Sequence, residues 1–199
     1  MRKLLLALVA ALLLTGTLVA TSPAQAGPVG RGEPTVPHTC TNWAWSGPQS
    51  WTASCGTYGI TITGDRGATL DLGFSTTICA KGATYAQSVK NYYKSVQASL
   101  KESGWKLDAT SPIARPQGAS PHYRSQMISF HTGRGAKKMQ GVATFDYDFT
   151  STSGGTSYCY QRSIARYAKA SAWNGVKGTL AKVEDSLAYS GPGGYEAQD

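Results

Sequence analysis

The sequence predicts an α+β protein in which an antiparallel sheet of about five or six strands carries two helices on one face. Two observations support this fold class. Runs in which apolar residues alternate with polar ones occur in clusters, joined by short glycine-rich turns. Two stretches show the three- and four-residue apolar spacing of a surface helix. Because the strands do not strictly alternate with helices, antiparallel pairing is favoured over parallel βαβ units.

The N-terminus has the pattern of a secretory signal peptide over 1–26. Two basic residues precede an apolar run over 4–19, which ends in the small-residue pattern Ala24-Gln25-Ala26. That run is about 16 residues long, shorter than the roughly 20 that a membrane-spanning helix needs, and no second apolar run follows it. We therefore expect cleavage before Gly27 and a secreted, extracellular chain without a transmembrane segment.

The rest of the chain is expected to divide into three parts. Residues 27–39 are rich in proline and glycine and predict an extended leader, 40–190 a single folded domain, and 191–199 a flexible tail. Removal of 1–26 takes two basic residues away, so that the 19 Lys and Arg fall to 17 against 11 Asp and Glu, a formal net charge of +6. A basic balance of this kind favours anionic partners and also keeps a secreted protein soluble.

The four cysteines remain after cleavage, and an even number in an exported chain predicts two disulfides. Three pairings are possible. We favour Cys40–Cys55, which closes a short loop, together with Cys79–Cys159, which ties the front of the domain to a late strand.

The first elements expected are a hairpin and a helix. Alternating residues over 58–62 and 70–74 flank a turn at 64–67. A helix over 85–103 follows, with Thr84 as its N-cap. Its apolar stripe is expected to pack on the apolar face of the hairpin, and it consists of Tyr85, Val89, Tyr92, Val96 and Leu100.

Three strands and a second helix are expected in the second half of the chain. The strands cover 126–130, 143–149 and about 157–164, whereas the run over 164–173 fits either a helix or a strand. The second helix starts with Asn174 as its N-cap. It ends before the Gly-Pro pair at 191–192, and its stripe is Val176, Leu180, Val183 and Leu187.

No catalytic motif is found, and the three histidines lie in different segments. A hydrolase is still possible if His131 meets Asp146 or Asp148 in three dimensions as a base with a carboxylate partner. Asp146 and Asp148 share a strand face, where they would bind calcium, act as an acid and base pair, or simply lie in solvent. We favour the solvated face and expect no metal and no cofactor.

The basic residues form a more coherent pattern. Lys90, Lys94 and Lys101 fall on the helix face opposite its apolar stripe. A second cluster lies in the glycine-rich connection between two strands and consists of Arg134, Lys137 and Lys138. Together they suggest binding of an anionic polymer, against the alternative of an ordinary solvated surface.

Trp43, Trp45 and Trp51 lie in or beside the predicted Cys40–Cys55 loop. Exposed indoles in a row would offer stacking surfaces to sugar rings, whereas small disulfide-closed loops also use tryptophan as their own core. We favour the core.

The function that the sequence favours is a secreted, non-enzymatic binding or interaction protein for an anionic or glycan component of the envelope or the surroundings. The first alternative is the hydrolase described above. The second is a secreted protein inhibitor that would use the Cys40–Cys55 loop. No motif assigns a family or an oligomeric state.

Overall fold

The computed structural model describes residues 33–79, 84–151 and 156–191, and this part of the chain forms an α+β fold with antiparallel sheets. Its helices are α2 (Tyr85–Glu102) and α3 (Trp173–Asp185), with short 3₁₀ turns η1 (Asp65–Gly67) and η2 (Gly135–Lys137). Its strands are β1 (Thr35–Cys40), β2 (Trp43–Pro48), β3 (Thr52–Cys55), β4 (Gly59–Thr63), β5 (Thr69–Ile78), β6 (Lys106–Thr110), β7 (Arg124–Thr132), β8 (Met139–Ser151), β9 (Ser157–Lys169) and β10 (Ala188–Tyr189).

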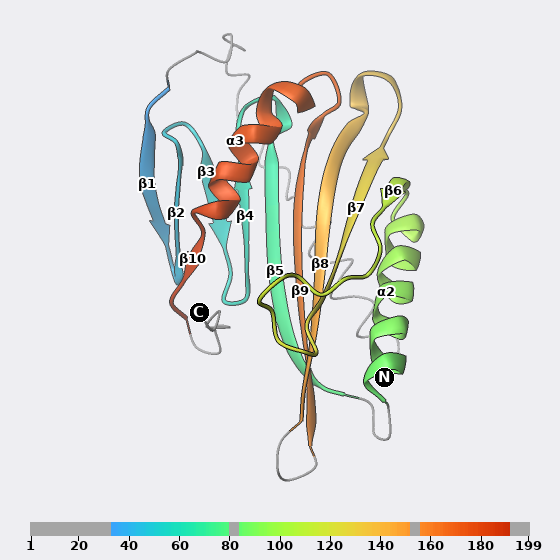
Figure 1. Cartoon of the computed structure of the whole chain (residues 1–199). Coiled ribbons are helices and arrows are strands. Elements are labelled where there is room, and N and C mark those ends of the chain that lie inside the picture. The colour runs from blue at the N-terminus through green and yellow to red at the C-terminus, as the bar shows by residue number, and fades with distance from the viewer. Residues whose placement is uncertain (1–32, 80–83, 152–155, 192–199) are drawn as a thin grey trace.

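The strands form two sheets. A seven-stranded sheet has the order β3-β4-β5-β9-β8-β7-β6, and a three-stranded sheet has the order β1-β2-β10 (Figure 1). The predicted number of five or six strands was too low, because β1, β2, β3, β6 and β10 are short, with six, six, four, five and two residues. The longest ladder joins β8 to β9, from Met139 opposite Lys169 to Ser151 opposite Ser157.

The β4–β5 hairpin confirms the clearest strand prediction. Ile60 pairs with Leu72 and Ile62 pairs with Leu70, so the apolar residues share one face as the alternation predicted. The run over 164–173, which fitted either period, continues β9 as far as Lys169 and then turns into α3. It forms a strand because β5 and β8 pair with it from both sides.

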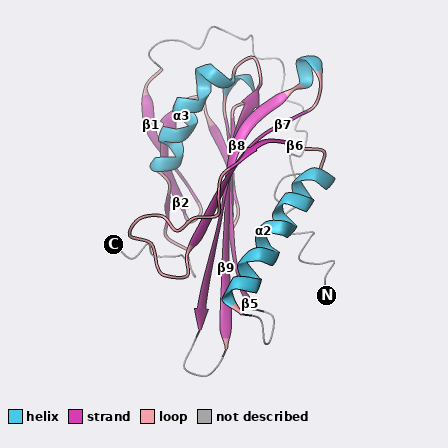
Figure 2. Cartoon of the chain, turned by 45° about the vertical axis from the view of Figure 1, so that its right-hand side comes forward, coloured by secondary structure: helices cyan, strands magenta, loops and turns pink. Residues whose placement is uncertain are grey.

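The prediction that both helices pack on one face of the sheet is wrong: α2 and α3 lie on opposite faces (Figure 2). The central strands show why. In β9, Ile164 and Ala168 belong to the cluster beneath α3, whereas Ala165 belongs to the cluster beneath α2. Since neighbouring residues of a strand point to opposite faces, a central strand with apolar residues on both needs a helix on each side.

The partner predicted for the first helix is also wrong. The apolar face of the β4–β5 hairpin packs against α3 and the tryptophans of β2, not against α2. Helix α2 covers the other end of the sheet, where Val96 and Leu100 pack with Phe145 and Tyr147 of β8. The amphipathic stripe showed that α2 must cover apolar surface, but several alternating strands offered such a surface.

Of the two predicted N-caps, Thr84 is confirmed and Asn174 is not. Thr84 caps α2, since its hydroxyl accepts a hydrogen bond from the backbone amide of Gln87 as predicted. Asn174 does not cap α3, because that helix already begins at the buried Trp173, after Ala172, without a side-chain cap. The first residue of α3 is therefore a buried indole, and no side chain caps this end of the helix.

Both predicted disulfides, Cys40–Cys55 and Cys79–Cys159, are present. In the described part of the chain, the first strand starts at Thr35, within the predicted leader over 27–39, because β1 pairs with β2 along its whole length. The predicted signal peptide over 1–26 and all but the first residue of the predicted tail lie outside the described residues. Within the described ranges, no helix is both long and apolar enough to cross a bilayer.

A buried carboxyl on the α2 side of the sheet gives a testable pH dependence. Asp71 is 8% exposed and accepts a 2.6 Å hydrogen bond from the hydroxyl of Tyr167. Burial raises the pKa of Asp71 above its usual value, although hydrogen bonds from Tyr167 and Thr61 oppose the shift. A carboxyl with a raised pKa binds more protons in the folded state, so its contribution to stability falls as the pH rises through the folded pKa.

We therefore expect Asp71→Asn to raise the melting temperature at pH 7 by more than at pH 4. Asparagine keeps an oxygen that accepts the hydrogen bond from Tyr167 and removes the charge that burial disfavours. Thermal unfolding followed by circular dichroism at the two pH values measures the difference. A larger rise in melting temperature at pH 4 than at pH 7 would contradict a raised pKa of Asp71 in the folded protein.

Candidate functional site

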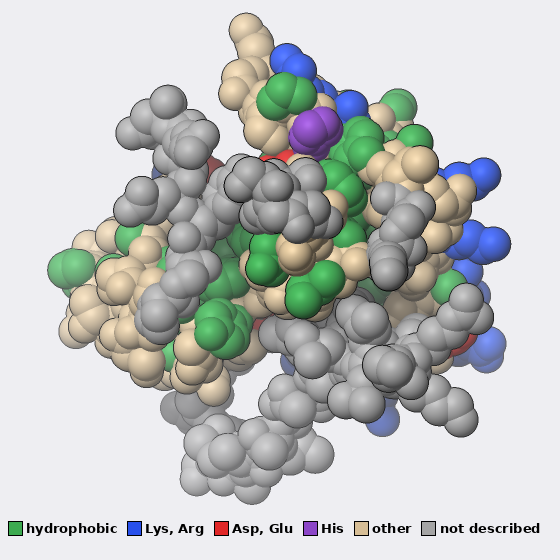
Figure 3. All heavy atoms as spheres, turned by 90° about the horizontal axis from the view of Figure 1, so that it is seen from below, with side chains coloured by type: hydrophobic (Ala, Val, Ile, Leu, Met, Phe, Trp, Pro, Cys, Tyr) green, Lys and Arg blue, Asp and Glu red, His purple; other side chains and the backbone are tan. Residues whose placement is uncertain are grey.

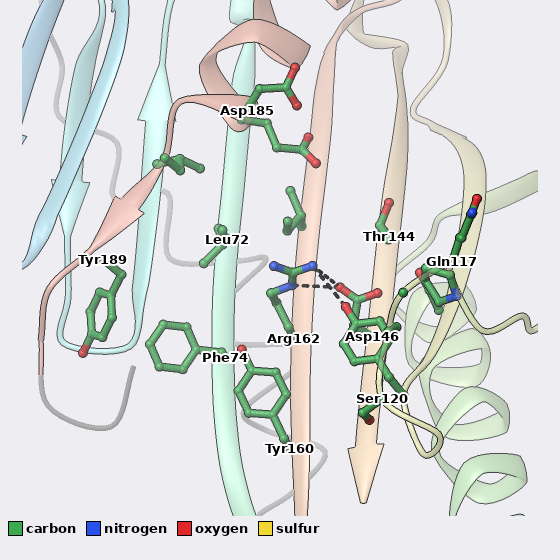
Figure 4. Close-up of a pocket in the computed structure, with 18 of the residues that line it drawn as sticks. Leu72, Phe74, Gln117, Ser120, Thr144, Asp146, Tyr160, Arg162, Asp185 and Tyr189 are labelled. Carbon is green, nitrogen blue, oxygen red and sulfur yellow. Dashed lines mark hydrogen bonds and ion pairs between the residues drawn. The ribbon is translucent and has the colours of Figure 1, made fainter. Parts of the chain in front are cut away.

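A cavity of about 1140 Å³ opens on the α3 face of the large sheet. Its floor is formed by β5, β9 and β8, and one wall by the end of α3 together with β10 (Figure 4). The opposite wall is the loop over 111–123, which crosses in front of the sheet on the same side as α3 (Figure 1). Such a volume suits a small molecule or a short segment of a polymer.

Aromatic side chains line one half of the cavity. Phe74 of β5 lies with its ring centroid 4.9 Å from that of Tyr189 and 6.3 Å from that of Tyr160. The ring of Trp43 lies 4.7 Å from that of Tyr189 and donates a 3.0 Å hydrogen bond from Nε1 to the carbonyl of Gly56. In Figure 4 Phe74, Tyr160 and Tyr189 lie together to one side of Arg162. This half of the cavity offers flat apolar surface.

An ion pair lies at the centre of the floor. Nε of Arg162 donates a 2.8 Å hydrogen bond to Oδ2 of Asp146, and Nη2 lies 2.7 Å from the same oxygen. The side chain of Asp146 is 2% exposed, whereas that of Arg162 is 37% exposed. The carboxylate is therefore held beneath the surface while part of the guanidinium remains accessible.

Tyr123, at the end of the covering loop, completes this network. Its hydroxyl accepts a 3.1 Å hydrogen bond from Nη2 of Arg162. Burial raises the pKa of Tyr123, and the nearby carboxylate of Asp146 raises it further. Through this hydrogen bond the phenol of Tyr123 joins the loop to the floor.

Acidic groups at the end of α3 set the charge of the wall that α3 and β10 form. Oε2 of Glu184 lies 2.9 Å from Nε of Arg166. Burial raises the pKa of Glu184, although the positive charge of Arg166 opposes that shift. Asp185 adds an exposed carboxylate. Among the residues that line the cavity, Arg162 therefore faces three carboxyl groups, from Asp146, Glu184 and Asp185.

The covering loop is fixed to the sheet at several points. Ser120 donates hydrogen bonds from Oγ to the carboxylate of Asp148, at 3.2 and 3.3 Å. Ala114 forms a β-bridge with Ser125 of β7, and Arg124 donates a 2.8 Å hydrogen bond to the carbonyl of Pro121. These contacts hold the wall of the cavity in place before any ligand enters, which lowers the cost of ordering it.

Comparison with known proteins identifies no family. No family model matches the chain, and no curated protein matches it. Thirteen solved chains match in fold. One is the solution structure of cyanobacterial PsbP (CyanoP) from Synechocystis sp. PCC 6803, at 12% identity and a TM-score of 0.46, covering 83% of this chain and 98% of that one.

Two further solved structures are similar at the same distant level. LpqN, described as involved in cell envelope biogenesis of Mycobacterium tuberculosis, has 11% identity and a TM-score of 0.43, covering 80% of this chain and 87% of that one. PA94 from Pseudomonas aeruginosa, described as a protein of unknown function and putative regulator, has 10% identity and a TM-score of 0.36, covering 77% and 96%. With TM-scores below 0.5, these likenesses carry no argument about the site, which rests on its own geometry.

The structure does not bring the candidate catalytic residues together. Nδ1 of His131 lies 2.6 Å from Oδ1 of Asp108 on the neighbouring strand β6. Asp146 pairs with Ser125, six residues from His131 along β7, a separation of about 20 Å. The expectation that Asp146 and Asp148 lie on a solvated face is wrong, because both are buried beneath the loop over 111–123, at 1% and 6% exposure.

The three tryptophans are core residues, as we favoured. Trp43, Trp45 and Trp51 are each 5% exposed or less, so they do not form an exposed stacking surface. Trp45 stacks on the ring of His38 at 3.9 Å. Trp43 alone among the three lines the cavity. No group of three or more metal-binding side chains occurs in the part of the chain that the structure describes.

Sequence reasoning missed the residues that make the cavity. Tyr160, Arg162 and Ile164 alternate along β9, and this pattern could have identified one face with mixed aromatic and charged character. Tyr123 and Glu184 carried no such signal, since a loop and the end of a helix bring them to that face only in the folded chain.

Proposed function

We propose that this protein is a secreted, non-enzymatic binding protein whose cavity holds a short segment of a neutral glycan. The observation that carries the proposal is the division of one cavity into an aromatic half and a hydrogen-bonding half. The apolar faces of sugar rings stack on aromatic side chains, and sugar hydroxyls both donate and accept hydrogen bonds. Arg162 offers donors, while Glu184 and Asp185 offer acceptors.

The charge of the cavity favours a neutral ligand over an anionic one. Three carboxyl groups and one guanidinium line it, and Asp146 already neutralises much of the charge of Arg162. An anion entering this space would approach the exposed carboxylate of Asp185, since Arg166 already pairs with Glu184 and the one lining cation, Arg162, is taken up by Asp146. A neutral polyhydroxylated chain avoids that repulsion.

The two alternatives have less support. A hydrolase built on His131 needs a carboxylate of Asp146 or Asp148 within hydrogen-bond reach, and these residues lie far apart on the sheet. An inhibitor loop needs an exposed, disulfide-braced segment, whereas the chain between Cys40 and Cys55 is largely taken up by β2 and β3. Two disulfides support the extracellular location in this proposal.

The proposal is tested with two tyrosines of β9. Tyr160 lines the cavity, whereas Tyr158 lies two residues earlier on the same sheet face, is 39% exposed and is not among the lining residues. Isothermal titration with cellotetraose, maltotetraose and chitotetraose should detect binding of at least one. We expect Tyr160→Ala to weaken that binding about tenfold, the value of one lost stacking contact.

Tyr158→Ala serves as the matched control and should change the affinity less than about twofold. Equal weakening by the two variants, or no binding of any of the three tetrasaccharides to the unaltered protein, would overturn the assignment of the cavity to a neutral glycan.

A further inference from the structure

The outer side of α2 carries a row of lysines on the sheet face opposite the cavity. Lys90, Lys94 and Lys101 are all exposed. On an α-helix they lie within about 40° of one another around the axis and extend over about 16 Å along it. The buried residues of α2 face the sheet, on which the helix lies in Figure 2, so the exposed lysines are on its outer side. We call these three residues the α2 lysine row.

Little negative charge accompanies this row. The one acidic residue of α2 is Glu102, next to Lys101 at the C-terminal end of the helix. The ion pairs found within the described ranges join His131, Arg162 and Arg166 to carboxylates, and none includes a lysine of the row. No ion pair of the described residues therefore offsets the mutual repulsion of these ammonium groups.

A second set of cations extends the row. Arg134, Lys137 and Lys138, in and beside η2, are exposed at the upper end of the β7–β8 hairpin, beyond the C-terminal end of α2 (Figure 1). Seen from below in Figure 3, lysine and arginine side chains also follow the edge of the molecule on the side where α2 lies. The positive surface is thus elongated rather than a single point.

The exposed residues of α2 argue for a polymer over a bilayer. A helix that lies on a membrane normally inserts large apolar side chains such as Trp, Phe or Leu beside its lysines. The large apolar side chains that are exposed in the described residues are Tyr58, Ile78, Ile113, Met127 and Tyr158, and none belongs to α2. The α2 lysine row therefore offers charge without an insertion surface.

We propose that the α2 lysine row is a second binding site, for a linear polyanion that bears phosphate or sulfate groups along a flexible chain. Positive charges spaced along a straight helix match negative charges repeated along an extended polymer. When the lysines neutralise anionic groups of the polymer, the counterions bound to those groups are released, which favours binding. This site lies on the sheet face that α2 covers, whereas the cavity lies on the face that α3 covers. One molecule would therefore bind a polyanion and the ligand of the cavity at the same time.

The test compares two matched pairs of lysines on exposed helix faces. Lys90→Gln/Lys94→Gln removes two charges from the row, and the control Lys177→Gln/Lys182→Gln removes two exposed charges from α3, on the opposite face. Binding of each variant to heparin, as the sulfated probe, and to long-chain polyphosphate is measured between 50 and 200 mM NaCl. Vesicles of anionic phospholipid provide a third arm.

We expect the row variant to bind heparin or polyphosphate about tenfold more weakly at low salt, with the slope of log K against log[salt] reduced by about 1.5. The control variant should bind within about twofold of the unaltered protein. Whichever polyanion is bound more tightly identifies the sulfated or the phosphorylated source. Equal weakening by both variants, binding that does not depend on salt, or tighter binding to the vesicles than to either polymer would overturn the proposal.

Titration of the row variant with the tetrasaccharides tests the α2 lysine row separately from the proposed glycan binding in the cavity. The row variant should keep the affinity of the unaltered protein for them, since α2 contributes no residue to the cavity. A row variant that loses tetrasaccharide binding as well would contradict the independence of the two sites.

Discussion

Replacing Cys79 and Cys159 together with alanine is expected to lower the free energy of unfolding by about 4–5 kcal/mol. The disulfide closes a loop with a sequence separation of 80, and restricting so long a loop in the unfolded chain contributes about 4.5 kcal/mol in the chain-entropy description. Both residues are buried, at 9% and 6% exposure, so the disulfide also fills part of the core beneath α2. Urea unfolding at pH 7 measures the change.

The other disulfide provides the matched control. Cys40–Cys55 has a sequence separation of 15, for which the same description gives about 3 kcal/mol. The variant without Cys40 and Cys55 should therefore be more stable than the variant without Cys79 and Cys159, by about 1.5 kcal/mol. The reverse order of stability would contradict this prediction. It would show that local contacts of the two disulfides, and not the entropy of the unfolded chain, decide the difference in stability between the two variants.

Arg162→Ala is expected to lower the free energy of unfolding by about 3 kcal/mol, the lower end of the range for a broken buried ion pair. The carboxylate of Asp146 is 2% exposed and would lose two close contacts with the guanidinium. The partial exposure of Arg162 keeps the expected effect at that lower end. Chemical unfolding of the variant at pH 7 gives the number directly.

Asp146→Asn tests whether the stability lost in Arg162→Ala comes from an uncompensated buried charge or from a loss of packing. With asparagine at 146, Arg162→Ala no longer leaves a buried carboxylate, so the second substitution should cost at least 1 kcal/mol less than it does alone. Additive effects of the two substitutions would contradict the ion pair as the source of the stability. Tetrasaccharide binding should be lost in Arg162→Ala, because the guanidinium forms part of the cavity floor.

The local elements could be predicted from the sequence to a large extent. The β4–β5 hairpin, the cap of α2 at Thr84 and both disulfide pairs are present as predicted. These features depend on residues close together in sequence or, for the disulfides, on a choice among only three pairings. The edge strands β1, β3 and β6 were missed, because they are short and owe their conformation to a neighbouring strand.

The candidate site was mostly hidden in the sequence. Asp146 was singled out as a possible acid, but its partner Arg162 was not, although the two lie opposite each other in the β8–β9 register. A shift of that register by one residue would turn Arg162 to the other face of the sheet, and no local pattern specifies the shift. Pairing of long strands is therefore what assembles the polar floor of the cavity.

By itself the sequence determined the two helices and the longer strands, which faces of these elements are apolar, where α2 begins and how the lysines of its outer face are arranged. Only the tertiary structure decided that the two helices lie on opposite faces of the sheet and that the loop over 111–123 buries Asp146 and Asp148. The physical reason is that the apolar periodicity of a helix or strand shows which of its faces must be buried. It does not show which other element buries that face, because this depends on packing between segments that are distant in the chain.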